Sequence, residues 1–482
     1  MGRVGDSRFA AWAVDDDGRV RTGGVLGGNR MRHRLPVSLV CIGVLTGLVA
    51  GAGAARASET PHRAAVDLPA SHSPAISADG RFIAFVSDVN DLLGGEPTAD
   101  PNGAKDVFRV DTLTGTVRLI SADHATGAPA NGASTAVDIS ADGRYVAFTS
   151  EASNLVPADL NGHSDVFRYD AVADGIELVS RKGLTGAQGN GVSDVPTISR
   201  DGDLVAFTSE STNLVGNDSN NRSDVFVRDM SAGSTTRVST DSNGKQSNGD
   251  SFQAAISPNG SVVAFSTTAT NLSKVDSSRT NDVYVKVLAS GKTSIVSVRT
   301  DGVRGSTDSF LEDVSNSGRF VALQSYSALV KNDTNNAGDV FLRDRTAGTT
   351  IRVSKDGSTQ ANDQSFGAAI SDDGAWIVFQ TWATNLVPGP DGNGSLTDVL
   401  EFEVATGDLT RISRDMEGGW PEAASYDTAL SGNGLRTCFA SAAADLVAGD
   451  TNGVDDVVCR TWGDASRTSA ITERWSVPLP LG

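Results

Sequence analysis

Acidic and amide side chains recur at a fixed spacing along this chain of 482 residues. The pattern is Asp-x-Asn-x-x-x-Asp, which places side-chain oxygens at positions 1, 3 and 7 of a short loop. Such a loop resembles the first half of a calcium-binding loop, because Ca²⁺ takes roughly six to eight oxygen ligands. The candidate metal ligands are Asp100, Asn102, Asp106, Asp159, Asn161, Asp165, Asp218, Asn220, Asp224, Asp333, Asn335, Asp339, Asp450, Asn452 and Asp456.

The same residues have a second interpretation, as turns. Asp and Asn side chains accept hydrogen bonds from nearby backbone N–H groups, and such Asx-turns would fix the start of the following strand. No Glu follows at a fixed position to supply the bidentate ligand of a calcium loop. The turn interpretation is favoured and the metal interpretation stays open. No cofactor is predicted to be required, and Ca²⁺ is the candidate ion.

Two tryptophans near the end of the chain are candidate ligand contacts. Trp420 lies in a Gly-rich segment, 417–421, and Trp382 follows a predicted strand. An exposed indole beside polar groups suits a sugar ring or a peptide. The alternative for Trp420 is that the ring anchors its own loop, as large aromatic side chains usually do.

Signatures of catalysis are missing from the sequence. It contains no G-x-S-x-G nucleophile elbow and no H-E-x-x-H zinc motif. No carboxylate pair stands out among the many acidic residues, so no catalytic residue is predicted. The favoured function is a non-catalytic binding or scaffolding module. The alternative is an extracellular hydrolase or lyase that acts on a glycan or lactone, with loop carboxylates as acid and base.

These candidate residues are positioned by a sevenfold repeat. A Ser-x5-Ser frame recurs with a mean period of 59 residues, and a turn such as Asp142-Gly143 follows each second Ser. The frames are Ser71/Ser77, Ser134/Ser140, Ser193/Ser199, Ser251/Ser257, Ser309/Ser315, Ser365/Ser371 and Ser425/Ser431. A fixed period of this size, built from short strands, predicts an array or a β-propeller.

One repeat contains four predicted strands, at 136–140, 145–150, 165–170 and 176–180. Four short antiparallel strands match a propeller blade. The sequence therefore predicts an all-β fold of seven blades. Six blades is the alternative, because the fourth strand of the last repeat, near 467–472, is poorly marked. An N-terminal segment near 62–67 is expected to support the outer strand of the last blade.

The connections between these strands differ in length. The first-to-second and third-to-fourth connections are short, whereas the second-to-third connection and the one between repeats are long. Antiparallel order places all the long connections on one face, around the mouth of the channel. Long loops on a rigid scaffold commonly carry binding function, so this face is predicted to bind a protein or a glycan.

The repeat also resembles a known family. The run Ser-x-Asp-Gly-(Arg)-x-Val-Ala-Phe is similar to the TolB-type, WD-like propeller repeat, over roughly residues 66–462. The resemblance implies a β-propeller and says little about activity, because this fold hosts many functions. The family's Trp is replaced by Ile, Val or Leu in every repeat, and only Ser257-Pro258 retains the Pro.

The N-terminal region reads as a secretory signal. Arg32 and Arg34 precede an apolar run, and Ala55-Arg56-Ala57 is a typical cleavage site. We expect residues 1–30 to be an over-extended start, 31–57 a signal peptide, 58–465 one propeller domain and 466–482 a tail. The mature protein would be secreted or extracytoplasmic, with no membrane insertion after cleavage.

Charge and cysteine content agree with export. The formal net charge is −19, and without residues 1–57 the chain carries 32 basic and 55 acidic residues, a net charge of −23. Such a surface repels nucleic acid, which is bound mainly through Lys and Arg. A monomer is expected. Cys438 and Cys459 fall on adjacent predicted strands, and an oxidising compartment would favour a disulfide between them.

Overall fold

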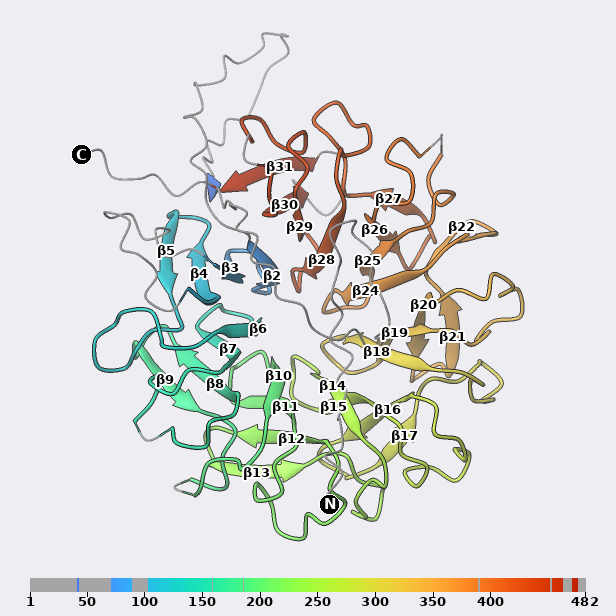
Figure 1. Ribbon diagram of the computed structural model, residues 1–482. Coiled ribbons are helices and arrows are strands. Elements are labelled where there is room, and N and C mark those ends of the chain that lie inside the picture. Colours follow the sequence, from blue (N-terminus) through green and yellow to red (C-terminus); the bar gives the residue numbers. More distant parts are fainter. Residues whose placement is uncertain are drawn as a thin grey trace, which may run out of the picture.

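The structure, a computed structural model, describes residues 41–42, 71–88, 103–157, 159–184, 186–388, 391–450, 453–462 and 470–475. Seven antiparallel sheets stand around a central axis, with the first strand of each sheet nearest that axis (Figure 1). The predicted all-β, seven-bladed propeller is confirmed, and the six-bladed alternative is wrong. No helix in the described residues has the length and apolar character that crossing a membrane requires.

Each blade is a meander in which consecutive strands are neighbours. Blade 1 has β2 (Ser71–Ile76), β3 (Phe82–Ser87), β4 (Asp106–Asp111) and β5 (Thr116–Leu119). Blade 2 has β6 (Ser134–Ile139), β7 (Tyr145–Ser150), β8 (Asp165–Asp170) and β9 (Gly175–Leu178). Blade 3 has β10 (Ser193–Ile198), β11 (Leu204–Ser209), β12 (Asp224–Asp229) and β13 (Ser234–Arg237). Blade 4 has β14 (Ser251–Ile256), β15 (Val262–Thr267), β16 (Asp282–Val287) and β17 (Thr293–Ile295).

The remaining blades follow the same plan. Blade 5 has β18 (Ser309–Val314), β19 (Phe320–Ser325), β20 (Asp339–Asp344) and β21 (Thr349–Arg352). A small hairpin of β22 (Lys355–Asp356) and β23 (Thr359–Gln360) follows it. Blade 6 has β24 (Ser365–Ile370), β25 (Trp376–Thr381), β26 (Asp398–Glu403) and β27 (Leu409–Arg411). Blade 7 has β28 (Ser425–Leu430), β29 (Arg436–Ser441), β30 (Asp456–Trp462) and β31 (Ala470–Trp475).

Blade 7 differs from the others by a fifth strand. Its fourth strand, β31, starts three residues after the predicted position and lies inside the segment expected to be a tail. The short strand β1 (Cys41–Ile42) pairs antiparallel with β31 and falls inside the predicted signal peptide. The segment 62–67, which we expected to support this blade, lies outside the described residues.

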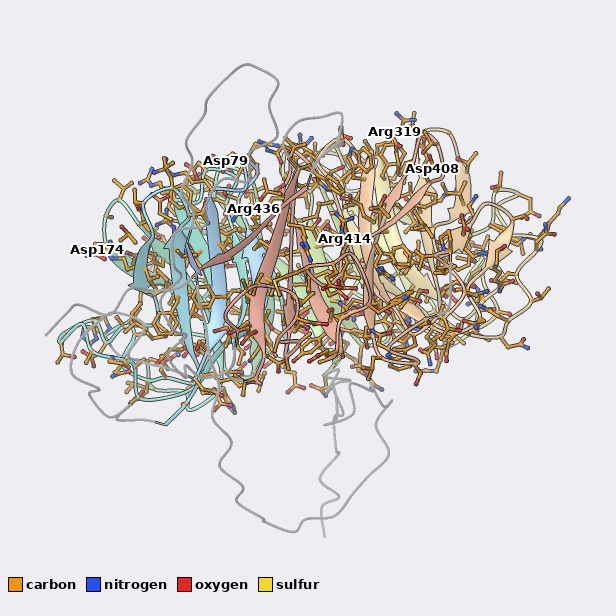
Figure 2. The ribbon with its side chains drawn as sticks, turned by 90° about the horizontal axis from the view of Figure 1, so that it is seen from above. Asp79, Asp174, Arg319, Asp408, Arg414 and Arg436 are labelled. Carbon is orange, nitrogen blue, oxygen red and sulfur yellow. A yellow bond between two sulfur atoms is a disulfide. The ribbon has the colours of Figure 1, made fainter. Side chains whose placement is uncertain are left out.

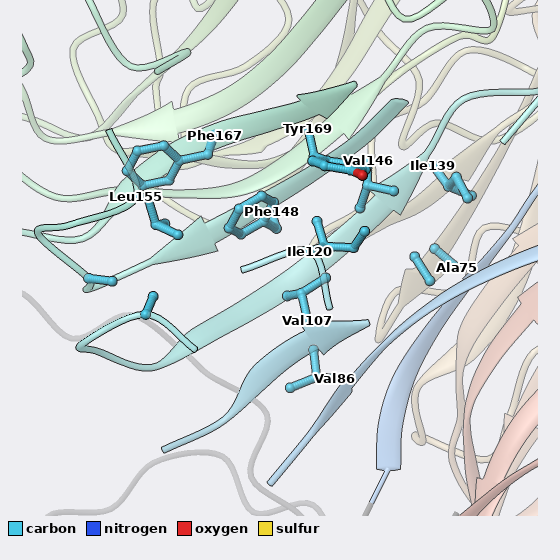
Figure 3. Close-up of a cluster of buried hydrophobic side chains, with 13 residues drawn as sticks. Ala75, Val86, Val107, Ile120, Ile139, Val146, Phe148, Leu155, Phe167 and Tyr169 are labelled. Atoms are coloured by element: carbon cyan, nitrogen blue, oxygen red, sulfur yellow. The ribbon is translucent and has the colours of Figure 1, made fainter. Parts of the chain in front are cut away.

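The space between neighbouring blades is filled by the apolar faces of their sheets. Between blades 1 and 2, Val86 and Val107 face Val146, Phe148 and Phe167 in one buried cluster (Figure 3). Four blades hold a stacked aromatic pair on their second and third strands, which confirms that these rings are structural. The pairs are Phe85–Phe108, Phe148–Phe167 and Phe207–Phe226, each at 5.8 Å between ring centroids, and Phe265–Tyr284 at 6.2 Å.

The Ser-x-Asp-Gly motif, with Asn or Ser in place of Asp in blades 4, 5 and 7, builds the first turn of each blade. In blade 2, Ser140 Oγ donates to Asp142 Oδ1 at 2.8 Å and accepts from the Tyr145 N–H at 2.9 Å. Gly143 takes a φ of 71°, which favours glycine. A Cβ atom at Gly143 would also lie 2.2 Å from the ring of Phe82 in blade 1. The motif therefore fixes both the turn and the contact with the preceding blade.

A closed ring of backbone hydrogen bonds joins the seven blades just after these second Ser residues. Every blade donates one N–H to the next blade, and blade 7 donates to blade 1. The bonds are Ala78–Ala141, Ala141–Arg200, Arg200–Pro258, Asn259–Asn316, Asn316–Asp372, Asp372–Gly432 and Asn433–Ala78, between 2.6 and 3.2 Å. Arg200 of blade 3 also pairs with Asp372 of blade 6, and these blades stand on opposite sides of the axis.

The connections are segregated by length, with one departure from expectation. Asp79 and Arg319, in first turns, and Asp408, in a third-to-fourth turn, lie along one face (Figure 2). The second-to-third connections form the opposite, long-loop face. The connections between blades do not all face the channel mouth, because their first halves lie against the outer strand of the next blade. There Thr235 Oγ1 donates to Arg181 O at 2.6 Å, and the Thr350 N–H donates to Thr300 Oγ1 at 3.0 Å. These contacts cover sheet edges that would otherwise be exposed.

Cys438 and Cys459 are paired residues of β29 and β30 and form a disulfide with an S–S distance of 2.06 Å. Their sequence separation is 21 residues. A crosslink that closes a loop of this length stabilises a fold by about 3 kcal/mol, chiefly through the unfolded chain. We expect the double variant Cys438→Ala/Cys459→Ala to lose this amount in urea denaturation. Equal midpoints for the oxidised protein and the double variant would contradict the expectation.

Candidate functional site

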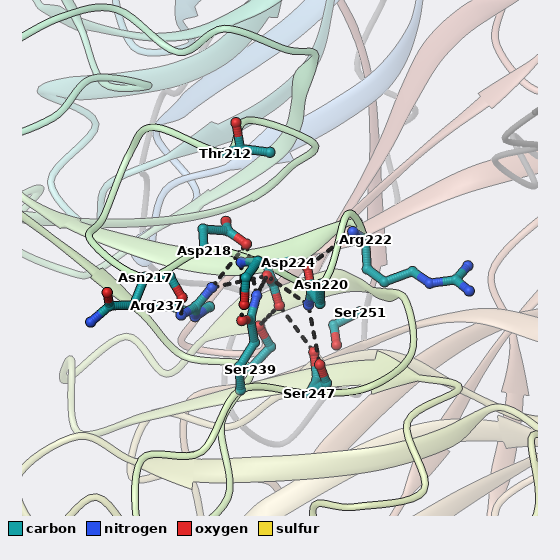
Figure 4. A network of polar contacts seen from close by, with 12 residues as sticks. Thr212, Asn217, Asp218, Asn220, Arg222, Asp224, Arg237, Ser239, Ser247 and Ser251 are labelled. Carbon is teal, nitrogen blue, oxygen red and sulfur yellow. Dashed lines mark hydrogen bonds and ion pairs between the residues drawn. The ribbon is translucent and has the colours of Figure 1, made fainter.

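The Asp-x-Asn-x-x-x-Asp loops are self-contained polar networks. In blade 3, the buried Asp224 accepts hydrogen bonds from Ser239 Oγ at 2.5 Å and Ser247 Oγ at 3.0 Å through Oδ1 (Figure 4). Its Oδ2 accepts from the side-chain amides of Asn220 and Gln246, both at 3.1 Å. Asp224 is thereby surrounded by donors that come from this chain.

The middle Asn of each described motif acts as a turn residue. Asn161 accepts from the His163 N–H at 2.8 Å through Oδ1, and its amide nitrogen donates to Asp165 at 2.7 Å. Asn220 and Asn335 make the same two contacts in blades 3 and 5. The side-chain oxygen of each Asn therefore accepts a hydrogen bond from the backbone. The side-chain nitrogen faces the Asp carboxylate that would bind the same metal ion.

Neutral and cationic side chains of the chain fill the position between the two Asp residues. Gln188 donates to Asp159 at 2.5 Å and to Asp165 at 2.7 Å. In blade 3, Arg237 pairs with Asp218 at 3.2 Å and with Asp224 at 3.4 Å. Arg304 and Arg352 form corresponding pairs in blades 4 and 5.

These contacts favour the turn interpretation, and Ca²⁺ binding stays a hypothesis. In the part of the chain that the structure describes, no group of three His, Cys, Asp or Glu side chains could hold a metal ion. Asp100, Asn102 and Asn452 lie outside the described residues.

Trp420 and Trp382 have separate neighbours and do not form one site. The guanidinium of Arg411 in β27 lies 3.8 Å from the centroid of the Trp420 ring, and this ring packs beside Gly392 of the second-to-third connection of blade 6. Trp382 contacts Phe366 edge to face at 5.3 Å and donates from Nε1 to Thr397 Oγ1 at 2.9 Å. Phe366 lines the central channel, so Trp382 supports the wall of that channel.

The central channel encloses a cavity of about 530 Å³, lined by the first strands of all seven blades. Four carboxyl side chains line it, from Asp138, Glu312, Asp313 and Asp427, and no Lys or Arg is among its lining residues. Sequence reasoning missed this site because these residues do not follow the sevenfold pattern. The available signal was an acidic residue inside an otherwise apolar inner strand, as in SFLEDV of β18.

Two of these carboxylates join neighbouring blades by accepting backbone hydrogen bonds from both. Asp138 accepts from the N–H groups of Ile139 and Ile198 at 2.8 and 2.7 Å. Asp313 accepts from Val314 and Ile370 at 2.7 and 2.9 Å. Burial raises the pKa of Asp138 to about 6 and that of Asp313 to about 7. Each has both oxygens bound to backbone, so their role is structural.

The other two carboxyls line the cavity and also accept hydrogen bonds from the next blade, with Ser73 Oγ donating to Asp427 at 3.4 Å. Glu312 accepts from the Ala368 N–H at 3.2 Å, and burial raises its pKa to about 8. Asp427 accepts from the Ser73 N–H at 3.1 Å, and burial raises its pKa as well. Ser73 in turn contacts the ring of His72, whose pKa is lowered to about 4 by burial and by nearby Lys105. The imidazole is therefore neutral at pH 7.

Backbone strain accompanies the channel wall. Every inner strand carries a β-bulge, and in six blades the third residue of that strand has a positive φ. These residues are Ser73, Ala136, Val195, Gln253, Gly367 and Asp427, with φ between 46° and 60°. In blade 5 the bulge falls at Glu312 instead. For the five residues other than Gly367, such conformations cost roughly 1–3 kcal/mol each.

Comparison with known proteins finds similar folds among solved structures. No family model matches the sequence, and no curated protein matches it. A prolyl endopeptidase structure is similar at 9% identity with a TM-score of 0.51, covering 86% of this chain and 50% of that one. The chain has the β-propeller fold. TolB from Agrobacterium tumefaciens is similar at 16% identity and a TM-score of 0.37, covering 62% of this chain and 84% of that one. An oligogalacturonate lyase in complex with manganese is similar at 12% identity and a TM-score of 0.49, covering 83% and 92%.

The prediction of a β-propeller is confirmed by the seven antiparallel blades themselves. The chain spans half the length of the prolyl endopeptidase that it resembles. At these identities, the likeness carries no activity over to this propeller.

Proposed function

We propose that this propeller is an exported, non-catalytic binding module that recognises a partner protein through its long-loop face. The observation that carries the proposal is a set of exposed apolar side chains on loops of that face. Leu160, Val275 and Met416 are 85%, 60% and 59% exposed. Loops held on a rigid scaffold commonly carry binding function, and these side chains are available there to a partner.

The polar networks of the loops support this role. Because the loop carboxylates of blades 2 to 5 are bound by Ser, Gln, Asn or Arg donors, they hold loop shape and are not free to act as acid and base. A rigid loop loses little conformational entropy when a partner docks. The apolar character of the exposed side chains favours a protein partner over a glycan. The signal-type segment and the strongly acidic composition support export.

The test compares two matched sets of substitutions. The triple variant Leu160→Ser/Val275→Ser/Met416→Ser alters the long-loop face, and Leu113→Ser/Val172→Ser alters similarly exposed side chains in third-to-fourth turns. Affinity capture from the extracellular fraction of the source organism would identify binding proteins. We expect a partner whose affinity falls at least ~10-fold with the triple variant only, because interface anchors each contribute about 1–2 kcal/mol. A partner lost equally with both variants, or retained by both, would refute the role of this face. A glycan array with Trp420→Ala as its control covers the carbohydrate alternative.

A further inference from the structure

The central channel is obstructed at one end. Where the first turns meet at the axis, Arg200 of blade 3 pairs with Asp372 of blade 6 across that axis (Figure 1). Gly432 of blade 7 lies at the same place, since a Cβ atom on it would be 2.5 Å from Asp372 Oδ2 and 3.0 Å from Ala78 Cβ. The long-loop face is therefore the way into the cavity of about 530 Å³, a volume that suits a small organic molecule.

Two aromatic rings line this cavity from neighbouring blades. Phe310 of β18 and Phe366 of β24 are each the second residue of an inner strand, and they are the aromatic residues among its described lining. Trp382 packs edge to face against Phe366 at 5.3 Å and supports that ring. Blades 2 and 3 carry Thr135 and Asp194 at the second position. The aromatic side of the cavity is therefore confined to blades 5 and 6.

A carboxyl group joins the two strands that carry these rings. Glu312 follows Phe310 by two residues and accepts from the N–H of Ala368, which follows Phe366 by two residues, at 3.2 Å. Two strand residues span about 7 Å, so one small molecule can contact both the rings and the carboxyl. Glu312 also lines the cavity. Burial raises the pKa of Glu312 to about 8, so at pH 7 the carboxyl is mostly protonated and its O–H is a donor.

The other lining groups disfavour a charged ligand. No Lys or Arg is among the described lining residues to pair with an anion. Asp138 and Asp313 accept from backbone N–H groups through both oxygens, and Asp427 accepts from Ser73 of blade 1. A cation would meet a protonated Glu312 and carboxylates that already have partners. A charge without a partner is costly in an apolar enclosure.

From this arrangement we propose that the channel binds a small neutral aromatic molecule that carries a hydrogen-bond acceptor, with its ring against Phe310 and Phe366 and its acceptor at Glu312. Aromatic rings attract one another in offset or edge-to-face contacts. The small apolar side chains of the remaining wall leave room for the body of the ligand. This site is separate from protein recognition by the exposed loop side chains, and neither needs the other.

Isothermal titration calorimetry of the full propeller at pH 7 tests the proposal with benzamide as the probe. We expect benzamide to bind with a dissociation constant below ~1 mM. Benzoate and benzylamine have the same ring with a negative or positive charge, and each should bind at least ~10-fold more weakly. Cyclohexanecarboxamide keeps the acceptor without the aromatic ring and should bind ~3–10-fold more weakly.

The role of Glu312 is tested by the pH profile of benzamide binding. Between pH 6 and 9 the affinity should fall at least ~5-fold, because ionisation of Glu312 removes the donor. Glu312→Gln keeps an N–H donor at every pH, so its affinity should stay within about twofold over this range. A carboxyl that only joins the two blades would give parallel profiles for the two proteins.

Phe366→Leu removes one ring and should weaken benzamide ~3–10-fold. The matched control is Phe252→Leu, at the same position of β14 in blade 4, because Phe252 is not among the described lining residues. It should leave the affinity within about twofold, as expected for a ring that the ligand does not touch. Thermal unfolding verifies that each variant is folded at each pH.

Four results would each overturn the proposal. They are absence of benzamide binding at ~10 mM, a charged probe that binds as tightly as benzamide, equal losses with Phe366→Leu and Phe252→Leu, and parallel pH profiles for Glu312 and Glu312→Gln. The comparison of probes needs no variant, so it stands even if a substitution prevents folding. It also needs no partner protein, so its failure would leave the proposed role of the long-loop face unchanged.

Discussion

Replacing Asp224 with Ala is expected to destabilise the propeller by about 3–5 kcal/mol, the usual cost of breaking a buried charged network on one side. Asp224 is fully buried and accepts from Ser239, Ser247, Asn220 and Gln246, while Arg237 lies 3.4 Å away. The substitution removes one acceptor from each of these donors and one of the two carboxylates that pair with Arg237. Denaturation by guanidinium chloride, monitored by circular dichroism, measures the loss.

Two comparisons locate the origin of this effect. Asp224→Asn keeps an oxygen for the two Ser hydroxyls but removes the charge opposite Arg237, so an intermediate loss is expected. Asp408→Ala, at an exposed turn, should change stability by less than about 0.5 kcal/mol. A loss below about 1 kcal/mol for Asp224→Ala would show that the loop relaxes and that the network does not hold it.

The stability of the protein is expected to fall as the pH rises from 5 to 8. Burial raises the folded-state pKa of Glu312 to about 8, of Asp313 and Asp398 to about 7, and of Asp138 to about 6. The ordinary values of these carboxyls are 4.5 for Glu and 3.8 for Asp. Between the two values the folded state binds more protons than the unfolded state, so the free energy of unfolding decreases with pH. The stabilisation is complete below the unfolded values and is lost as the pH passes the folded ones.

Glu312 alone should contribute on the order of 2–4 kcal/mol to this decline, since one pKa unit corresponds to about 1.4 kcal/mol. Glu312→Gln is therefore expected to raise the melting temperature at pH 8 and to flatten the curve between pH 5 and 8. Melting temperatures recorded at each pH unit for both proteins provide the measurement. A melting temperature that climbs towards pH 8, or parallel curves for the two proteins, would contradict the assignment.

The fold could be predicted from sequence because its determinants are local and repeated. Ser140, Asp142 and Gly143 lie within one turn and bond to one another, so their spacing is visible along the chain. The role of the acidic loops was harder to predict, because the side chains that donate hydrogen bonds to them lie further along the sequence. Gln246 follows Asp224 by 22 residues and has no fixed motif.

The channel site could not be predicted from local patterns. Asp427 contacts Ser73 across 354 positions of sequence, and Glu312 reaches the next blade 56 residues on. Closure of the ring of blades places both residues on the wall of the same cavity. Their positions also break the repeat, so a search for periodicity treats them as exceptions. Trp420 and Trp382 were predicted as ligand contacts from the chemistry of the indole ring. In the structure they pack against different residues.

The ring of backbone hydrogen bonds at the axis bears on how the molecule unfolds. A linear repeat protein frays from its end units, because each end has only one neighbour. Here the bond from Asn433 to Ala78 gives the first and last blades two neighbours each. Detaching any blade therefore breaks two of the seven links at once, and no end unit exists from which melting can start. The described blades should accordingly melt in a single cooperative transition, with amide hydrogens of all seven inner strands exchanging at one common slow rate.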